Sequence, residues 1–250
     1  MSRTPFGAQV RVCPTPDDVA RAAAAALADL AREVASHAGR FTLALSGGET
    51  PRRLYRVLAE DYADALPWAK MHLFWGDDRF VPPDDPASNV RMAREALLAH
   101  VPLPETNVHP MPVFFRDPAA AAADYEATLK SYWRAPWPRF DLMLQGLGAD
   151  GHTASLFPHS PVLAEQRRWV VSVVAENATP PQRLTVTLPV INNARRVVFI
   201  VTGAAKARVV RDVLSGAADV QSHPAAGVAP VNGEVVWWLD EAAAASLPTG

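Results

Sequence analysis

A glycine-rich loop with several reactive side chains lies near the middle of the chain, in the stretch GLGADGHTASLFP (Gly146–Pro158). Its three glycines let the backbone turn with positive φ and pass close to a ligand. Within the loop His152 follows Asp150, and imidazole, with an unperturbed pKa near ~6.5, suits a general base at neutral pH. The alternative is a turn whose Asp, Ser and Thr residues only cap the next helix. The position of His152 between an acid and two hydroxyl side chains favours a catalytic loop over a capping turn.

A second loop, SGGETP, has the composition of an anion-binding turn. Ser46, Gly47 and Gly48 follow an apolar run, and Thr50 with Pro51 begins a predicted helix. Backbone N–H groups of such a loop, together with the positive end of the helix dipole, form a site for phosphate. The loop is neither a Walker A sequence nor a GxGxxG fingerprint. Taken alone it is a weak signal, because many such loops are tight turns with a helix cap.

Charged residues stand in two further loops. Asp78 and Arg79 belong to WGDDR, where two adjacent acids beside an arginine can orient one another and a ligand. The alternatives are a solvated turn or a structural ion pair. Lys206, in TGAAKA, lies in the first turn of a predicted helix and opposes its dipole, which an anion bound there would explain. The alternative is an ordinary surface lysine.

Buried strands are expected to position all four loops. They are predicted at 40–45, 71–75, 140–145 and 196–201. Further strands are predicted at 9–13, 169–174, 183–188 and 235–239, with a proline-interrupted edge strand at 108–114. Helical patterns alternate with these strands, which predicts an α/β fold with a mostly parallel open sheet and helices on both faces. Parallel strands end at the same edge, so the four loops can converge there.

Size and composition set limits on the function. The 250 residues, 49% of them hydrophobic, are expected to form a single domain over 1–250. With 24 basic and 26 acidic residues, the chain has no electrostatic footprint for nucleic acid or an anionic membrane. Cys13 is the only cysteine, which excludes an internal disulfide and favours a reducing compartment. Without a signal peptide or a run of ~20 apolar residues, we expect a soluble cytoplasmic protein.

Several stretches together resemble the 6-phosphogluconolactonase family, in order and over nearly the whole chain. They are SGGETP, FWGDDRFVPPDDPASNVRMARE, FDLMLQGLGADGHTASLFP, PPQRLTVTLPVINNARRVVFIVTGAAKA and VVWWLDEAAA. The related glucosamine-6-phosphate deaminases share the fold and a phosphate loop. The combination of GHTASLFP with WGDDR resembles the lactonases more than it resembles these deaminases. The resemblance implies a deaminase/isomerase-like, Rossmann-type three-layer fold. Glu49 departs from the family, which more often has a small polar residue there, and we expect it to face solvent.

The resemblance implies hydrolysis of 6-phospho-D-glucono-1,5-lactone to 6-phospho-D-gluconate, the second step of the oxidative pentose phosphate pathway. Such a reaction needs an oriented water, a base and donors for the developing oxyanion. His152 is the candidate base, and either Asp150 or Asp78 could orient it. Arg79 could bind the phosphate or the oxyanion. The remaining phosphate candidates are Ser46, Gly47, Gly48, Thr50, Lys206 and, more weakly, Arg183.

No metal or cofactor is expected. His152 has no Cys, Glu or second His at ligand spacing, and Ser155 is not set in a G-x-S-x-G nucleophile motif. The expected partner is a small-molecule sugar-phosphate lactone, and we expect the enzyme to be a monomer. The alternatives are a glucosamine-6-phosphate deaminase/isomerase and a sugar-phosphate sensor without turnover. A sensor of this kind usually carries a DNA-binding helix-turn-helix, for which the chain has no spare segment.

Overall fold

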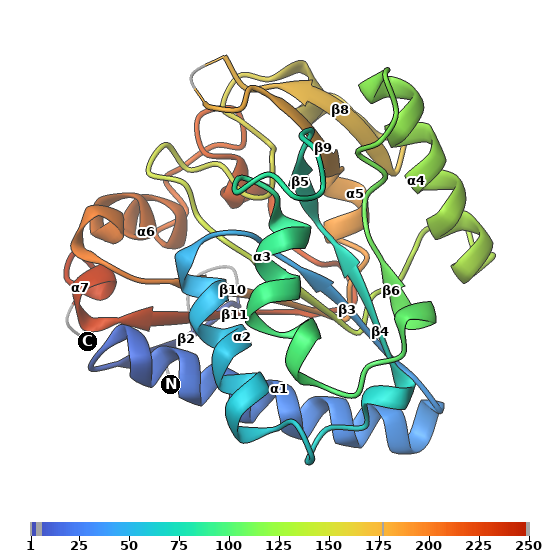
Figure 1. Ribbon diagram of the computed structural model, residues 1–250. Coiled ribbons are helices and arrows are strands. Elements are labelled where there is room, and N and C mark those ends of the chain that lie inside the picture. Colours follow the sequence, from blue (N-terminus) through green and yellow to red (C-terminus); the bar gives the residue numbers. More distant parts are fainter. Residues whose placement is uncertain (1, 4–6, 177, 249–250) are drawn as a thin grey trace.

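The computed structural model describes residues 2–3, 7–176 and 178–248. Its centre is a sheet that is parallel except for the antiparallel pairing of β1 with β2 (Figure 1). In spatial order the strands are β1 (Ser2–Arg3), β2 (Gln9–Cys13), β11 (Glu234–Asp240), β10 (Arg196–Val201), β7 (Leu142–Gln145), β3 (Phe41–Leu45), β4 (Met71–Trp75) and β6 (Val108–His109). The predicted mostly parallel sheet is confirmed. The edge strand at 108–114 is shorter than predicted, because Pro110 and Pro112 have no N–H to donate to a ladder.

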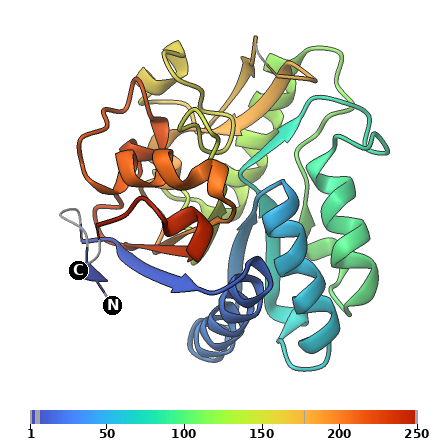
Figure 2. The same cartoon turned by 90° about the vertical axis from the view of Figure 1, so that its left-hand side faces the viewer.

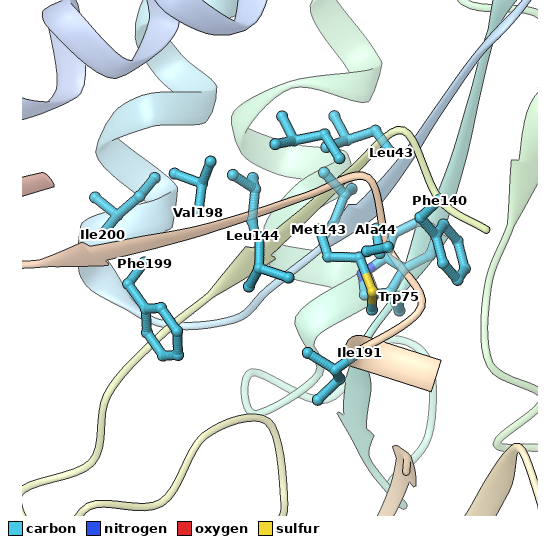
Figure 3. Packing of buried hydrophobic residues seen from close by; sticks show 14 of the residues in the cluster. Leu43, Ala44, Trp75, Phe140, Met143, Leu144, Ile191, Val198, Phe199 and Ile200 are labelled. Carbon is cyan, nitrogen blue, oxygen red and sulfur yellow. The ribbon is translucent and has the colours of Figure 1, made fainter. Parts of the chain in front are cut away.

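Helices cover both faces of this sheet, as predicted (Figures 1 and 2). They are α1 (Pro16–Ala38), α2 (Glu49–Asp61), α3 (Asn89–Ala96), α4 (Pro118–Trp133), α5 (Leu188–Ile191), α6 (Ala207–Leu214) and α7 (Glu241–Ala244). Successive strand residues face opposite layers. In β10, Val198 points to the side of α1, whereas Phe199 points to the other side (Figure 3). There Phe199 stacks on Trp237 of β11. Both layers are buried, which explains why these strands read as continuous apolar runs.

Local signals set the ends of the longest helix. Thr15 caps α1 by accepting a hydrogen bond from the N–H of Asp18, and Pro16 occupies the first position. Asp17 and Asp18 complement the helix dipole. Gly39 ends the helix with a left-handed φ of 74°. These four features are local in sequence, and they explain why a helix beginning after Thr15 and ending before Gly39 was predictable.

A second, antiparallel sheet lies beyond the carboxyl end of β4 (Figure 1). Its strands are, in order, β5 (Asp77–Arg79), β9 (Gln182–Val186) and β8 (Val170–Val174). The strands predicted at 169–174 and 183–188 exist, but they pair with each other and with β5. The expectation that Asp77–Arg79 form only a loop is wrong, because pairing with the distant β9 makes this segment a strand. This pairing sets Arg79 directly opposite Arg183.

Candidate active site

Three of the four predicted loops meet at the carboxyl edge of the central sheet. Thr50 Oγ1 lies 2.9 Å from Thr202 Oγ1, which joins the turn after β3 to the turn after β10. A Cβ on Gly146 would lie 3.8 Å from Ser46 Oγ, so the glycine-rich loop passes beside the first turn. Lys206 is close enough to Asp150 for the carboxylate to raise its pKa, although burial has the larger, lowering effect. Ser46, Thr50, Asp150, His152 and Lys206 therefore share one neighbourhood.

An aspartate–histidine pair stands at the centre of this region. His152 Nδ1 lies 2.6 Å from Asp150 Oδ1, and the backbone N–H of His152 donates to the same oxygen at 3.2 Å. Burial alone would raise the pKa of Asp150, but the hydrogen bonds and charge of His152 lower it to about 2. A carboxylate only accepts, so Nδ1 carries the proton. In the neutral imidazole Nε2 is then the acceptor atom. It has no hydrogen-bond partner among the described residues, and the side chain is 32% exposed.

Two glycines are required by close contacts in the same loop. A Cβ on Gly148 would lie 2.0 Å from His152 Nδ1 and 2.4 Å from Asp150 Oδ1. Gly151 has a φ of 86°, and a Cβ there would lie 2.9 Å from the Cα of His223. Gly148 N–H also donates to the carbonyl of His152 at 2.8 Å. The glycine pattern thus allows the loop to fold back on itself and hold the imidazole.

Buried hydrogen bonds hold the glycine-rich loop in place. Thr153 is fully buried, with Oγ1 at 2.8 Å from Gln145 Oε1 and 2.9 Å from the carbonyl of Gly146. Ser155 is also fully buried, and its hydroxyl donates to Asp77 Oδ2 at 2.7 Å. Sequence reasoning missed Gln145, and it noted Asp77 only as one of the two adjacent acids of WGDDR. The only signals were a polar residue ending an apolar run, for Gln145, and an adjacent acid, for Asp77.

Hydrogen bonds and one close contact fix the turn after β3. The hydroxyl of Tyr55 accepts from Ser46 N–H at 3.0 Å and donates to the Ser46 carbonyl at 2.8 Å. A Cβ on Gly47 would lie 1.9 Å from Asn89 Oδ1, so only glycine fits beneath this amide. Gly48 precedes α2 with a φ of 105° and no side-chain cap. The first N–H groups of α2 therefore remain available to an anion.

Glu49 points away from this turn, as expected. Its side chain is 62% exposed, and its carboxylate lies 3.5 Å from Arg52 Nε. The Glu49 carboxylate thus forms an ion pair with Arg52 on the outer face of α2.

Asp78 occupies a different position from the one expected for a partner of His152. It is fully buried, and its Oδ1 accepts from the N–H groups of Arg79 and Asn89, each at 2.7 Å. Val90 N–H donates to Oδ2 at 3.3 Å. Burial raises the pKa of Asp78 to about 6 in spite of these hydrogen bonds. The carboxylate caps α3, and Asp150 is the acid that contacts the imidazole.

Arg79 and Arg183 form a pair of adjacent guanidinium groups in the second sheet. Arg79 Nη1 donates to the Ala87 carbonyl at 2.6 Å, and Arg183 Nε donates to the Pro180 carbonyl at 2.9 Å. Arg183 is only 7% exposed, and its pKa is lowered by burial and then by the charge of Arg79. Two like charges held side by side favour an anion between or beside them. Asp77, the first residue of β5, accepts a hydrogen bond from Ser155 and so links these strands to the glycine-rich loop.

No group of three or more His, Cys, Asp or Glu side chains is arranged to hold a metal ion within the described ranges. In the same part of the chain, no helix combines the length and apolarity that crossing a bilayer requires.

Comparison with known proteins shows which family this chain is similar to. Residues 14–237 match the family described as "Glucosamine-6-phosphate isomerases/6-phosphogluconolactonase". A 6-phosphogluconolactonase of Synechocystis sp. is 48% identical over 212 residues, covering 84% of this chain and 85% of the relative. One from Mycobacterium tuberculosis is 40% identical over 250 residues, covering 98% and 100%. The solved structure of 6-phosphogluconolactonase from Trypanosoma cruzi has a TM-score of 0.88 at 29% identity, covering 100% of both chains.

Proposed function

This chain belongs to the family of glucosamine-6-phosphate isomerases and 6-phosphogluconolactonases, and we propose that it hydrolyses 6-phospho-D-glucono-1,5-lactone to 6-phospho-D-gluconate. The family expected from the motifs is confirmed, and relatives named for this activity match nearly the whole chain. One observation carries the mechanism: the Asp150–His152 pair, with a free Nε2, stands beside a turn whose N–H groups can hold a phosphate.

In the proposed mechanism His152 activates water. Nε2 takes a proton from a water molecule as its oxygen attacks the lactone carbonyl carbon, and Asp150 stabilises the imidazolium through Nδ1–H. The tetrahedral intermediate then breaks the bond between the carbonyl carbon and the ring oxygen. The imidazolium returns its proton to that oxygen, which becomes the hydroxyl of the open-chain acid. Neither a metal ion nor a cofactor takes part in these steps.

Ser155 has no place in this mechanism as a nucleophile. Its side chain is fully buried, and its hydroxyl is already bound to Asp77. This arrangement supports direct attack by water without a covalent intermediate. We assign Ser155 and Asp77 to positioning the glycine-rich loop, and Asp78 to capping α3.

The phosphate is assigned to the turn after β3 and to Lys206 of the turn after β10, which the contact between Thr50 and Thr202 joins to it. Donors from Ser46, Gly47, Gly48 and Thr50, with the ammonium group of Lys206, would meet its charge. Lys206→Ala should chiefly raise KM, if its contact is the same in the ground and transition states. Arg183 is the weaker candidate for the same group. Arg79 serves either the phosphate or the oxyanion, and Arg79→Ala distinguishes the two roles. A raised KM would indicate phosphate binding, whereas a lowered kcat would indicate stabilisation of the oxyanion.

The central test is a direct assay with the purified protein. We expect it to accelerate opening of the lactone well beyond the spontaneous rate. His152→Gln should lower kcat by about 10²-fold or more, because general-base catalysis is lost. His100→Gln, which removes an exposed histidine, is the matched control. Release of ammonia from glucosamine 6-phosphate without lactone hydrolysis would instead identify a deaminase, and tight binding of 6-phosphogluconate without turnover would identify a sensor.

Two further assignments belong to this proposal. We propose that the enzyme acts as a monomer, because every candidate site residue comes from one chain; light scattering after size exclusion would test this. We also propose a cytoplasmic location, which suits a chain whose single cysteine, Cys13, is not in a disulfide. Cell fractionation would test the second assignment.

A further inference from the structure

Three arginines converge at the amino-terminal edge of the central sheet, opposite the candidate active site. Arg40 immediately precedes β3, Arg195 immediately precedes β10, and Arg139 lies shortly before β7. These strands are neighbours in the order β10, β7, β3, and parallel strands begin at the same edge. The arginines line a cavity of about 410 Å³, together with Asp141 and Trp133.

The one carboxylate of this cavity is already engaged. Asp141 Oδ2 accepts from the N–H of Thr42 at 2.9 Å and from its hydroxyl at 2.7 Å. Asp141 Oδ1 lies 3.3 Å from Arg195 Nε, which is the only ion pair that this carboxylate forms among the described residues. Asp141 therefore balances at most one of the three guanidinium charges.

Arg40 and Arg139 have no carboxylate partner in the part of the chain that the structure describes. Arg40 places its guanidinium carbon 4.9 Å from the centre of the Tyr132 ring. Arg139 Nη2 donates to the Asn232 carbonyl at 2.9 Å, and its Nε is enclosed without a hydrogen-bond partner. Neither a ring face nor a carbonyl neutralises a full positive charge. With three arginines and one aspartate, the cavity concentrates an excess of positive charge in a chain whose net charge is −2.

We propose that this cavity is a second anion site, which binds the phosphate group of a small molecule. Guanidinium groups match the oxygens of phosphate with paired hydrogen bonds, and convergence from three strands suits a compact dianion. The cavity and the candidate active site lie at opposite ends of the same strands. A strand of five residues spans roughly 17 Å, so one ligand of sugar-phosphate size cannot occupy both. The proposal is thus independent of the lactonase activity.

The experiment uses the full chain carrying Lys206→Ala, which weakens phosphate binding at the candidate active site. Inorganic phosphate, pyrophosphate and glucose 6-phosphate are titrated at constant ionic strength, and binding is followed by calorimetry and by the NMR resonance of Arg139 Nε–H. We expect saturable binding with a shift of that resonance. Equal affinity for the three probes identifies the free phosphate group as the ligand, and tighter binding of the sugar phosphate identifies an organic phosphate.

Matched variants decide the location of the bound anion. Adding Arg40→Gln and Arg139→Gln should weaken binding at least about tenfold, while Arg21→Gln and Arg56→Gln, at exposed positions elsewhere, should leave it unchanged. Arg195→Gln, on a side chain that is 58% exposed, gives a milder variant should the double change impair folding. With Lys206 intact, the double variant should keep full lactone hydrolysis. A titration with sodium chloride is the control for non-specific anion binding. Phosphate affinity no higher than chloride affinity, or phosphate binding that survives the double change, would overturn the proposal.

Discussion

At the scale of single residues, the proposed chemistry depends on which atom of His152 carries its proton. Asp150 accepts from Nδ1 and thereby leaves Nε2 free to take a proton from water. The low pKa of Asp150, about 2, means that this acceptor stays ionised throughout the physiological range. The ionised Asp150 therefore keeps the neutral imidazole in the tautomer that is protonated at Nδ1.

Asp150→Asn tests this arrangement. An amide can donate to Nδ1, which would favour the tautomer protonated at Nε2, so kcat should fall by about 10²- to 10⁴-fold with little change in KM. Since the Asp150 pKa is depressed, its protonation should lower the wild-type rate only as the pH falls toward about 2. Steady-state kinetics between pH 5 and 8 measure the loss of kcat in the variant. Over that range Asp150 stays ionised in the wild type and should contribute no fall in rate. Asp124→Asn, on the exposed side of α4, is the control, and an unchanged kcat in Asp150→Asn would contradict the assignment.

At the scale of elements, the glycine-rich loop after β7 is shaped by contacts that forbid a side chain. Gly148→Ala would place a methyl group 2.0 Å from His152 Nδ1, so the imidazole must move. We expect a loss of kcat of about 10²-fold, since misplacing a catalytic group by ~1 Å has an effect of this size. Gly39→Ala has open space around the new methyl group and should cost about 1 kcal/mol of stability through its positive φ, with kcat unchanged. Kinetics and thermal melting distinguish the two variants.

A different element, the β4–β6 edge, should make stability depend on pH. His109 of β6 stacks on Phe74, and its Nε2 lies 3.2 Å from Nδ1 of His72. Burial, followed by the charge of His72, lowers the pKa of His109 to about 4. Because the unfolded histidine takes up a proton near pH 6.5, stability should be lost as the pH falls from about 6.5 to about 4.

The size of this loss can be measured against a variant. After discounting for partial exposure, we expect roughly 1–2 kcal/mol from His109 over this window. His109→Gln should flatten the dependence of unfolding free energy on pH, whereas His100→Gln serves as the exposed control. Urea unfolding at pH 4.5, 5.5 and 7 provides the measurement. An equal slope in wild type and His109→Gln would show that the histidine pair does not account for acid sensitivity.

The elements themselves were largely predictable, because their signals are local. In α4 the start is marked in the sequence by Asp117 and Pro118, and Asp117 caps the helix by accepting from Ala119 N–H and Ala120 N–H. Strand pairing was not predictable to the same degree. Nothing near Asp77 in sequence indicates that it will lie opposite Thr185, since that contact depends on how the whole chain turns back over the sheet.

At the scale of the whole molecule, the two sheets are joined through α4. Glu126 of α4 accepts from the N–H groups of Trp169 and Val170, at 2.7 and 3.2 Å, where β8 begins. Trp169 also stacks on Trp137, with ring centres 6.0 Å apart. The N–H of Val186 in β9 donates to the carbonyl of Gly76, directly after β4. These contacts support the proposal that residues 1–250 behave as one domain.

One cooperative unfolding transition should follow from this connection. Far-UV circular dichroism and tryptophan fluorescence should give the same urea midpoint, because neither sheet can lose its packing without exposing the other. Glu126→Ala should lower that midpoint by leaving two N–H groups without their acceptor, at a cost of about 1–3 kcal/mol, and still give a single transition. Midpoints that differ between the two signals would contradict a single domain.

The sequence by itself determined the fold class and the family, and it indicated four candidate segments at strand ends, because hydrophobic period, helix caps and short motifs depend on neighbouring residues. Only the tertiary structure decided that Asp150 rather than Asp78 contacts His152, that Arg79 lies opposite Arg183, and that three arginines meet at the far edge of the sheet. These relations join residues far apart along the chain, as Thr50 and Thr202 do. They arise from strand order and crossover connections, which no local pattern encodes.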